Sequence, residues 1–157
     1  MPATIHASAV LVGARAVLIR GPSGTGKSRL ALQLIEAGWR GGVYFTRLVG
    51  DDRVHLEAAG GRLLVRPAPA LAGLIELRGL GILRRDYEPC AVVGLVVDLH
   101  AADAQRLPEK CEAIVEGIPL PRLPVASGAA PLPAILATLA PSGLHGGSFG
   151  DQESRIG

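Results

Sequence analysis

The stretch Gly21-Pro22-Ser23-Gly24-Thr25-Gly26-Lys27-Ser28 decides the fold of this chain. It fits the pattern G-x-x-x-x-G-K-[ST], a loop that wraps the phosphates of a nucleoside triphosphate. The apolar run Ala16-Val17-Leu18-Ile19 before it predicts a short buried strand, and residues 27–37 after it predict an amphipathic helix. Strand, glycine loop and helix in this order are the context that the motif requires. We therefore expect the loop to bind nucleotide phosphate.

The composition of the loop explains how it would do so. Glycines leave no Cβ in the way, so that successive backbone N–H groups can point inward and form an anion-binding nest. A helix beginning near Gly26 adds its positive N-terminal end. Lys27 can reach the β- and γ-phosphates, and the hydroxyl of Ser28 can ligate Mg²⁺. Gly38 is expected to end this helix.

The overall composition predicts one domain built on an aliphatic core. The chain has 157 residues, of which 48% are hydrophobic and only 3% aromatic, so Val, Leu, Ile and Ala must fill the interior. A formal net charge of +2 is too small to indicate a nucleic-acid partner. The sequence contains no run of about 18 apolar residues, the length that would indicate a membrane span. We therefore expect a cytoplasmic protein. Cys90 and Cys111 lack the spacing of metal ligands and are expected to be buried free thiols.

The pattern along the chain predicts an α/β fold with a mixed sheet and few helices. Gly60-Gly61 between two short alternating runs predicts a hairpin, and Pro131 is a typical first residue of a helix. Residues 1–140 are expected to form the catalytic domain, and residues 141–157, which are rich in Gly and Ser, a flexible tail. The predicted strands are residues 4–12, 16–19, 43–49, 53–57, 62–65 and 91–99, and the second helix is 131–139.

Acidic and basic residues outside the loop supply candidate chemistry. Asp51 and Asp52 follow the apolar Leu48-Val49, where the metal-binding acid of a P-loop enzyme lies, although a solvated turn is the alternative. One of these acids could hold Mg²⁺ while the other takes a proton from a substrate hydroxyl. Glu76 and Arg78 could supply a metal ligand and a phosphate contact, or form a surface ion pair. His6 lies 21 residues before Lys27; a lone histidine is usually a surface or structural residue, and a catalytic role is the alternative.

Four segments together resemble the HPr kinase/phosphorylase family. They are His6, the glycine loop, Gly50-Asp51-Asp52-Arg53-Val54, and the stretch Gly73-Leu74-Ile75-Glu76-Leu77-Arg78-Gly79-Leu80-Gly81-Ile82. The last is similar to the family signature L-E-I-R-G-L-G-I, which is far more specific than a P-loop. The resemblance spans roughly residues 4–100. The short chain resembles the truncated forms of alphaproteobacteria, which consist of the catalytic domain only.

This resemblance implies a protein-serine kinase whose fold is similar to phosphoenolpyruvate carboxykinase around the nucleotide. The family transfers the γ-phosphate of ATP to a serine of HPr, the phosphocarrier protein of the sugar phosphotransferase system. It also runs the reverse reaction with inorganic phosphate, and its full-length members form hexamers, so a homo-oligomer is expected. The resemblance implies the following roles by position: Lys27 and Ser28 hold phosphate and Mg²⁺, Asp52 accepts the serine proton beside its acidic neighbour Asp51, His6 is a catalytic histidine, Glu76 is a magnesium ligand, and Arg78 belongs to the same catalytic segment.

The chain departs from the family pattern in several places. Arg29 stands where the family has Glu after the P-loop serine, and residues 41–47 lengthen the connection to the acidic pair. The family segment P-V-x-x-G-R-N corresponds to residues 124–130, which contain no arginine, although Arg122 is near enough to be considered as a substitute. The C-terminal helices that grip HPr also look absent. We therefore expect the kinase direction, with weak or no phosphorolysis.

Two other functions are compatible with the loop. A nucleotide-gated regulator would bind ATP and a partner without turnover, which the missing arginine favours. A small-molecule kinase on a generic P-loop scaffold is the other alternative, but the Glu76–Arg78 segment has no natural place in it.

Overall fold

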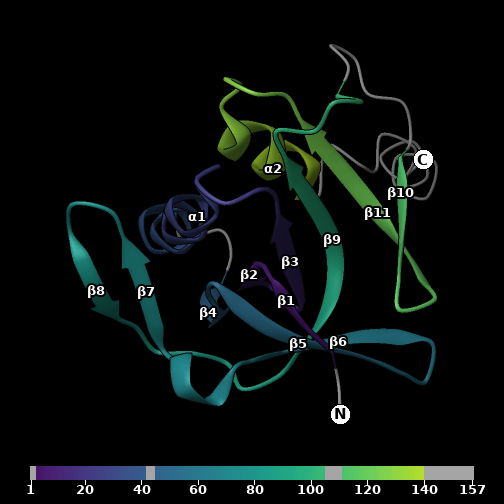
Figure 1. Ribbon diagram of the computed structural model, residues 1–157, viewed down its shortest axis with the longest axis horizontal. Coiled ribbons are helices and arrows are strands. Elements are labelled where there is room, and N and C mark those ends of the chain that lie inside the picture. Colours follow the sequence, from purple (N-terminus) through teal and green to yellow (C-terminus); the bar gives the residue numbers. More distant parts are fainter. Residues whose placement is uncertain (1–2, 42–44, 105–110, 140–157) are drawn as a thin grey trace, which may run out of the picture.

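The computed structural model describes residues 3–41, 45–104 and 111–139. It is a mixed α/β fold dominated by strands, as the sequence predicts (Figure 1). In chain order the elements are β1 (Ala3–His6), β2 (Ser8–Val12), β3 (Arg15–Arg20), α1 (Lys27–Gly41), β4 (Thr46–Gly50), β5 (Arg53–Ala59), β6 (Arg62–Pro67), a 3₁₀ turn (Pro69–Leu71), β7 (Leu74–Leu77), β8 (Gly81–Arg84), β9 (Ala91–Leu99), β10 (Glu112–Val115), β11 (Ile118–Val125) and α2 (Pro131–Leu139).

One large sheet carries the fold, and β9 lies at its branch point. The strand order is β1-β5-β6-β9-β3-β2-β4, and β11, which pairs with β10, also joins β9. β9 is parallel to both β3 and β11, while the other pairs of this sheet are antiparallel. Since β2 is antiparallel to both of its neighbours, β3 and β4 run in the same direction. The carboxyl ends of β3, β4 and β9 therefore meet at one edge, where the start of β2 also lies.

Two apolar clusters hold the sheet. One lies between the sheet and the helices α1 and α2, and contains Leu30, Leu34 and Ile135. The other lies on the opposite face, where strands β1, β5, β6, β10 and β11 curve over β2, β3 and β9. The buried apolar residues in both are only Ala, Val, Leu and Ile, which confirms the predicted aliphatic core.

Several predicted elements are confirmed. The P-loop strand is β3, the central buried strand is β9, and the second helix is α2 with the predicted bounds. The hairpin turn at Gly60 and Gly61 joins β5 to β6, with φ angles of 60° and 76°. Glycine suits both positions because the left-handed region strains other residues.

Other expectations were wrong in detail. The single strand predicted over residues 4–12 is two strands, which separate at Ala7, whose N–H donates to the carbonyl of Asp52 instead of continuing one ladder. β4 begins at Thr46, and residues 43 and 44 lie outside the described residues. The hairpins β7–β8 and β10–β11 were not predicted. Cys90 and Cys111 are free thiols, but both are only half-buried.

Gly38 does not end α1, which continues to Gly41. A Cβ at Gly38 would lie 2.2 Å from Oγ1 of Thr46, so the glycine allows the helix to pack directly against β4. The Thr46 hydroxyl also donates to the carbonyl of Ile35 at 2.9 Å. The glycine is therefore a packing residue and not a helix terminator. In the part of the chain that the structure describes, no helix has the length and apolar character needed to cross a membrane. The predicted tail, residues 141–157, lies outside that part.

Candidate active site

The glycine loop forms the turn that the motif predicts, between the end of β3 and the start of α1 at Lys27. Gly26 has a φ of 94°, and among the described residues no atom beyond its two chain neighbours lies within 4 Å of the position a Cβ would take. Its backbone conformation, and not lack of space, therefore requires glycine. The N–H of Leu30 bonds the carbonyl of Gly26 at 2.9 Å, the first hydrogen bond of the helix. The backbone amides that precede Leu30 in the first turn therefore have no acceptor within the helix and lie at the end that adjoins the loop. The first turn of α1 carries no acidic residue that would repel a phosphate.

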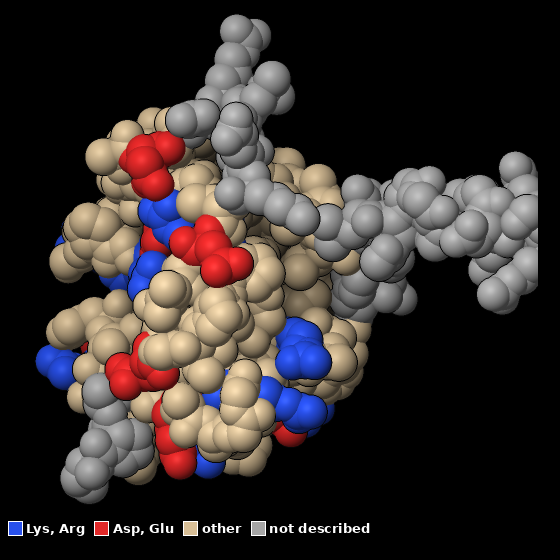
Figure 2. All heavy atoms as spheres, turned by 90° about the vertical axis from the view of Figure 1, so that its right-hand side faces the viewer, with Lys and Arg blue, Asp and Glu red and all other residues tan. Residues whose placement is uncertain are grey.

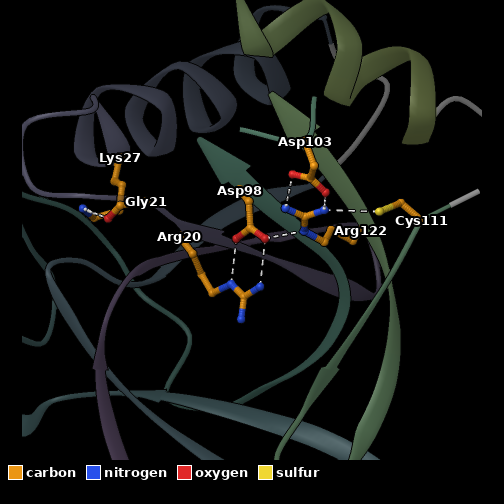
Figure 3. Close-up of polar contacts among 7 residues, drawn as sticks. All are labelled: Arg20, Gly21, Lys27, Asp98, Asp103, Cys111 and Arg122. Carbon is orange, nitrogen blue, oxygen red and sulfur yellow. Dashed lines mark hydrogen bonds and ion pairs between the residues drawn. The ribbon is translucent and has the colours of Figure 1, made fainter. Parts of the chain in front are cut away.

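Lys27 lies over the loop that precedes it. Its Nζ donates to the carbonyls of Gly21 at 2.8 Å and Pro22 at 3.2 Å, and Figure 3 shows the side chain bent toward Gly21. Both acceptors are neutral. A phosphate oxygen carries formal negative charge and makes the stronger hydrogen bond to an ammonium group. The lysine is thus held beside the glycine loop by contacts with neutral acceptors, which a phosphate group could replace.

Ser8, Ser28 and Asp51 form a buried group that we call the serine–aspartate cluster. Asp51 directly follows β4 and is 2% exposed. The Ser8 hydroxyl donates to its Oδ1 at 2.5 Å, and Oγ of Ser28 lies 2.9 and 2.8 Å from the two carboxylate oxygens. Among the described residues Asp51 makes no ion pair. A buried carboxylate without a cation is costly.

The residues of this cluster fit a magnesium ion. Hard oxygen donors are the ligands that Mg²⁺ takes in proteins, and the P-loop Ser with a strand-end Asp is the pair that holds it in P-loop enzymes. Ser28 and Asp51 supply such oxygens side by side, although the two residues are 23 positions apart in the sequence.

Asp52 lies in a different environment from Asp51. It adopts a left-handed φ of 67°, and its side chain is 64% exposed, as is that of His6. Nδ1 of His6 lies 3.8 Å from Oδ1 of Asp52. Two adjacent acids are therefore divided between a buried position beside the P-loop serine and an exposed position beside a histidine. The structure therefore places His6, a predicted site residue outside the loop, beside Asp52 of the acidic pair.

Glu76 and Arg78 are placed less closely. Glu76 lies on β7, and its backbone N–H reaches Oδ2 of Asp51 at 3.4 Å, while its side chain is exposed. Arg78 lies just beyond the end of β7. The described residues contain no group of three or more His, Cys, Asp or Glu side chains arranged to hold a metal. The role of Glu76 as a magnesium ligand stays a prediction.

The structure adds a second polar group at the same edge, which we call the arginine–aspartate network: Arg20, Asp98, Arg122 and Asp103 (Figure 3). Asp98 receives Nε and Nη2 of Arg20 at 2.7 and 2.8 Å, and Nε of Arg122 at 2.5 Å. Arg122 also donates to both carboxylate oxygens of Asp103, at 2.6 and 3.0 Å, and to the sulfur of Cys111 at 3.2 Å. The network ties the carboxyl ends of β3 and β9 to β11.

Sequence reasoning missed this network because only the strand order creates it. Arg20 and Asp98 are register partners in parallel strands although they are 78 residues apart. Burial alone raises the pKa of Asp98, but the hydrogen bonds from Arg20 and Arg122 and their charges hold it below its ordinary value. The hydrogen bond from Arg122 likewise lowers the pKa of Asp103, and the pKa of Arg122 is raised by its bonds to Asp103 and Asp98.

The ion pairs of Arg122 also bear on whether it can replace the arginine that is missing after Val125. Arg122, considered as its substitute, is 15% exposed and bound to two carboxylates. It is therefore compensated by its own network and not free to face a nucleotide. Figure 2, which shows the face carrying β9, β10 and β11, has acidic and basic side chains intermixed there.

Comparison with known proteins matches this fold and these residues to one family. The model of the HPr Serine kinase C-terminal domain matches residues 2–116. An HPr kinase/phosphorylase of Exiguobacterium sp. is 40% identical over 100 residues, which cover 63% of this chain and 26% of that protein. One of Streptococcus thermophilus is 42% identical over 81 residues, or 51% of this chain and 24% of that protein.

The chain thus spans about a quarter of the length of these curated relatives. A solved structure, the Hpr(Ser) kinase/phosphatase from Coxiella burnetii, superposes with a TM-score of 0.69 at 26% identity, covering 87% of this chain and 93% of that one. The family match covers well over half of the chain and includes the P-loop, both acids and the Glu76–Arg78 segment. The chain belongs to the HPr serine kinase C-terminal domain family.

Proposed function

We propose that this chain is an ATP- and Mg²⁺-dependent protein-serine kinase that phosphorylates a serine of HPr or a related phosphocarrier. The observation that carries the proposal is the division of the acidic pair. Asp51 is buried against the P-loop serine, and Asp52 is exposed beside His6. Membership in the family and relatives named HPr kinase/phosphorylase support the acceptor.

The groups of this chain supply the parts that phosphoryl transfer needs. The amides of the P-loop and Lys27 bind the β- and γ-phosphates, and Ser28 with Asp51 would hold Mg²⁺. When bound, the ion neutralises charge that develops on the phosphate oxygens. The serine hydroxyl oxygen forms a bond to the γ-phosphorus while Asp52 accepts the hydroxyl proton. At the same time the bond between the γ-phosphorus and the β–γ bridging oxygen breaks. ADP then leaves, and His6 positions the Asp52 carboxylate.

The exposure of Asp52 supports a macromolecular acceptor. A base that takes a proton from a small molecule is usually enclosed with its substrate in a pocket. Asp52 instead stands in a left-handed turn with 64% of its side chain exposed. A protein serine can reach it from outside, and the acceptor's own surface then excludes water from the reacting groups.

The test uses the purified chain, ATP, Mg²⁺ and a panel of phosphocarriers, with phosphoserine measured by mass spectrometry. Asp52→Asn should lower the rate by about 10² or more, because general base catalysis contributes about that factor. Glu116→Gln removes an exposed acid in the β10–β11 turn and should leave the rate unchanged. Full activity in the Asp52→Asn chain would exclude Asp52 as the base, and no phosphoserine on any carrier would exclude the kinase.

A second function, a nucleotide-gated regulator, is favoured by one observation. Arg122 is engaged by Asp98 and Asp103, so it does not replace the family arginine absent after Val125. ATP binding that changes affinity for a phosphocarrier, with neither transfer nor hydrolysis, would identify this function. For the kinase, the same missing arginine leads us to expect little pyrophosphate from phosphoserine-HPr and inorganic phosphate.

The proposal includes self-association. Leu80 and Ile82 near the tip of the β7–β8 hairpin are each 66% exposed, and Ile114 on β10 is 74% exposed. Exposed side chains of this kind often belong to interfaces between copies. Light scattering of the purified chain should give a mass above that of one copy; a monomer at all concentrations would contradict this part of the proposal.

A further inference from the structure

We propose that Ser8 is a positioning residue, a role that rests on the kinase function proposed for this chain. Its hydroxyl fixes the carboxylate of Asp51, so that Mg²⁺ would meet that carboxylate in one defined arrangement. Ser8 is the first residue of β2 and its exposed fraction is 0%. It donates its proton to Oδ1 of Asp51 at 2.5 Å. None of the four segments that resemble the HPr kinase/phosphorylase family contains it.

A bulge between β2 and β4 brings the two side chains together. The register of β4 against β2 shifts between Ala9 and Val10, and Ala9 lies opposite Gly50. Continued by one residue, this register places Ser8 opposite Asp51, and residues opposite each other in antiparallel strands share a face of the sheet. Without the shift Ser8 would lie opposite Gly50, and the two polar side chains would point to different faces. Bulges of this kind are common beside active sites.

The three residues from His6 to Ser8 contact both acids. His6 lies 3.8 Å from Asp52, the N–H of Ala7 donates to the carbonyl of Asp52 at 3.2 Å, and Ser8 binds Asp51. The break between β1 and β2 at Ala7 therefore coincides with the contacts that hold the turn after β4. The acidic pair is fixed by this segment as well as by the P-loop serine.

Ser8 makes the two oxygens of the Asp51 carboxylate unequal. Oδ1 accepts the Ser8 hydroxyl in a short hydrogen bond. Ser28 has one hydroxyl proton for both oxygens, at 2.9 and 2.8 Å, and the N–H of Glu76 reaches Oδ2 only at 3.4 Å. Among the described residues Oδ2 thus has the weaker donors, and it is the oxygen left for a magnesium ion. Hydrogen bonds that orient a ligating carboxylate in this way are general in metal sites.

Loss of the Ser8 hydroxyl should separate metal affinity from catalysis. A donated hydrogen bond draws charge from a carboxylate, so Ser8→Ala does not reduce the attraction between Asp51 and a cation. The carboxylate can then turn and offer either oxygen or both, whereas transfer requires one geometry. We expect kcat to fall about 10–100-fold, the usual effect of losing such a partner. Metal should bind as tightly as in the native chain, or more tightly.

The first measurement does not depend on catalysis. Mn²⁺ serves as a paramagnetic probe in place of Mg²⁺. Its titration in the presence of ADP gives the affinity, and its electron paramagnetic resonance spectrum reports the arrangement of its ligands. Ser8→Ala should change the spectrum without weakening binding, and Ser8→Thr, which keeps the hydroxyl, should give the native spectrum. The second measurement is kcat for phosphotransfer at saturating Mg²⁺ and ATP, which should fall in Ser8→Ala and recover in Ser8→Thr.

Thr46→Val is the matched control. Thr46 is 8% exposed, begins the same strand β4 that ends before Asp51, and donates to the carbonyl of Ile35. Losing this buried hydroxyl should lower stability and leave both the Mn²⁺ spectrum and kcat unchanged. If Ser8→Ala does not fold, Ser8→Cys takes its place, because it is close to serine in size and offers only a weak donor.

A native Mn²⁺ spectrum in the Ser8→Ala chain would overturn the proposal. So would a loss of kcat or of Mn²⁺ affinity that Thr46→Val reproduces, since Ser8 would then act only through stability. Absence of Mn²⁺ binding by the native chain with ADP would overturn it as well. A native chain that transfers phosphate to no phosphocarrier would exclude the kinase, while the Mn²⁺ spectra would still decide whether Ser8 positions Asp51.

Discussion

The two polar groups at the carboxyl edge of the sheet differ in how their charges are compensated. In the arginine–aspartate network, Asp98 lies between two guanidinium groups and Arg122 between two carboxylates. In the serine–aspartate cluster, the partners of buried Asp51 among the described residues are two hydroxyl groups and one amide, and those of neighbouring Lys27 are carbonyl oxygens. In the first group each carboxylate is paired with a guanidinium group, and these ion pairs hold the strands together. The second has uncompensated charge of both signs, which is what a magnesium–triphosphate complex requires.

Lys27→Ala should give the largest effect, and on activity rather than stability. Among the described residues the lysine bonds two exchangeable carbonyls, so the free energy of unfolding should change little. Loss of a positioned charge facing the transferred phosphate lowers kcat/KM by about 10²–10³, equivalent to about 3–4 kcal/mol. Steady-state phosphotransfer assays and urea unfolding measure the two quantities. The matched change Arg29→Ala, on an exposed position of the same helix, should keep most activity; equal losses would mean that Lys27 acts only through general charge.

Asp98→Asn should give the opposite pattern. It removes the carboxylate shared by Arg20 and Arg122, and leaves two guanidinium groups facing an amide. Breaking a fully buried pair costs several kcal/mol, but Arg20 is a third exposed and can be hydrated, so we expect a loss of about 2–3 kcal/mol in unfolding free energy. The KM for ATP should change less than the stability does. Asp103→Asn, which removes only the exposed outer partner, should cost much less. A chain with native stability but no ATP binding would reverse the assignment of the two groups.

Ser8→Ala should have a smaller effect on stability. The hydroxyl donates to buried Asp51 at 2.5 Å, and its loss leaves a carboxylate oxygen less satisfied, at a cost of about 1–2 kcal/mol. Mg²⁺ together with ATP should recover part of this loss, because an ion at Asp51 would compensate the carboxylate. Urea unfolding with and without Mg²⁺ and ATP measures both. Ser23→Ala, at an exposed loop position, serves as the control, and an equal effect of the two changes would contradict the role given to Ser8.

The sequence predicted the serine–aspartate cluster better than the arginine–aspartate network for a physical reason. Ser28 and Asp51 each follow a local signal, a P-loop and the end of an apolar strand, and strand direction alone brings them to one edge. Asp98 and Arg122 meet only because β11 joins β9 in parallel. That strand was missed because three of its eight residues are proline, which removes ladder donors and argues against a strand.

Local patterns also could not reveal how residues are divided between neighbouring elements. Residues 4–12 have strand-like composition throughout, and the interruption at Ala7 arises from its bond to Asp52, 45 residues later in the chain. Gly38 has the composition of a helix terminator, but its role is set by Thr46 on the strand it packs against. In each case a contact between distant segments overrides the local preference.

The pH dependence of stability gives the smallest expected effect and tests the network alone. Burial raises the pKa of Asp98, but the two arginines outweigh it, so the pKa in the folded chain is below its ordinary value of 3.8. Between those two pKa values the unfolded chain binds more protons than the folded one, so the contribution of Asp98 is present above about pH 4 and is lost as pH falls further. The Asp98→Asn chain lacks this carboxylate, so the difference in unfolding free energy between it and the native chain should shrink from about pH 6 toward about pH 3 in urea titrations. A difference that stays constant over that range would mean that Asp98 stabilises the fold by its shape and hydrogen bonds rather than by its charge.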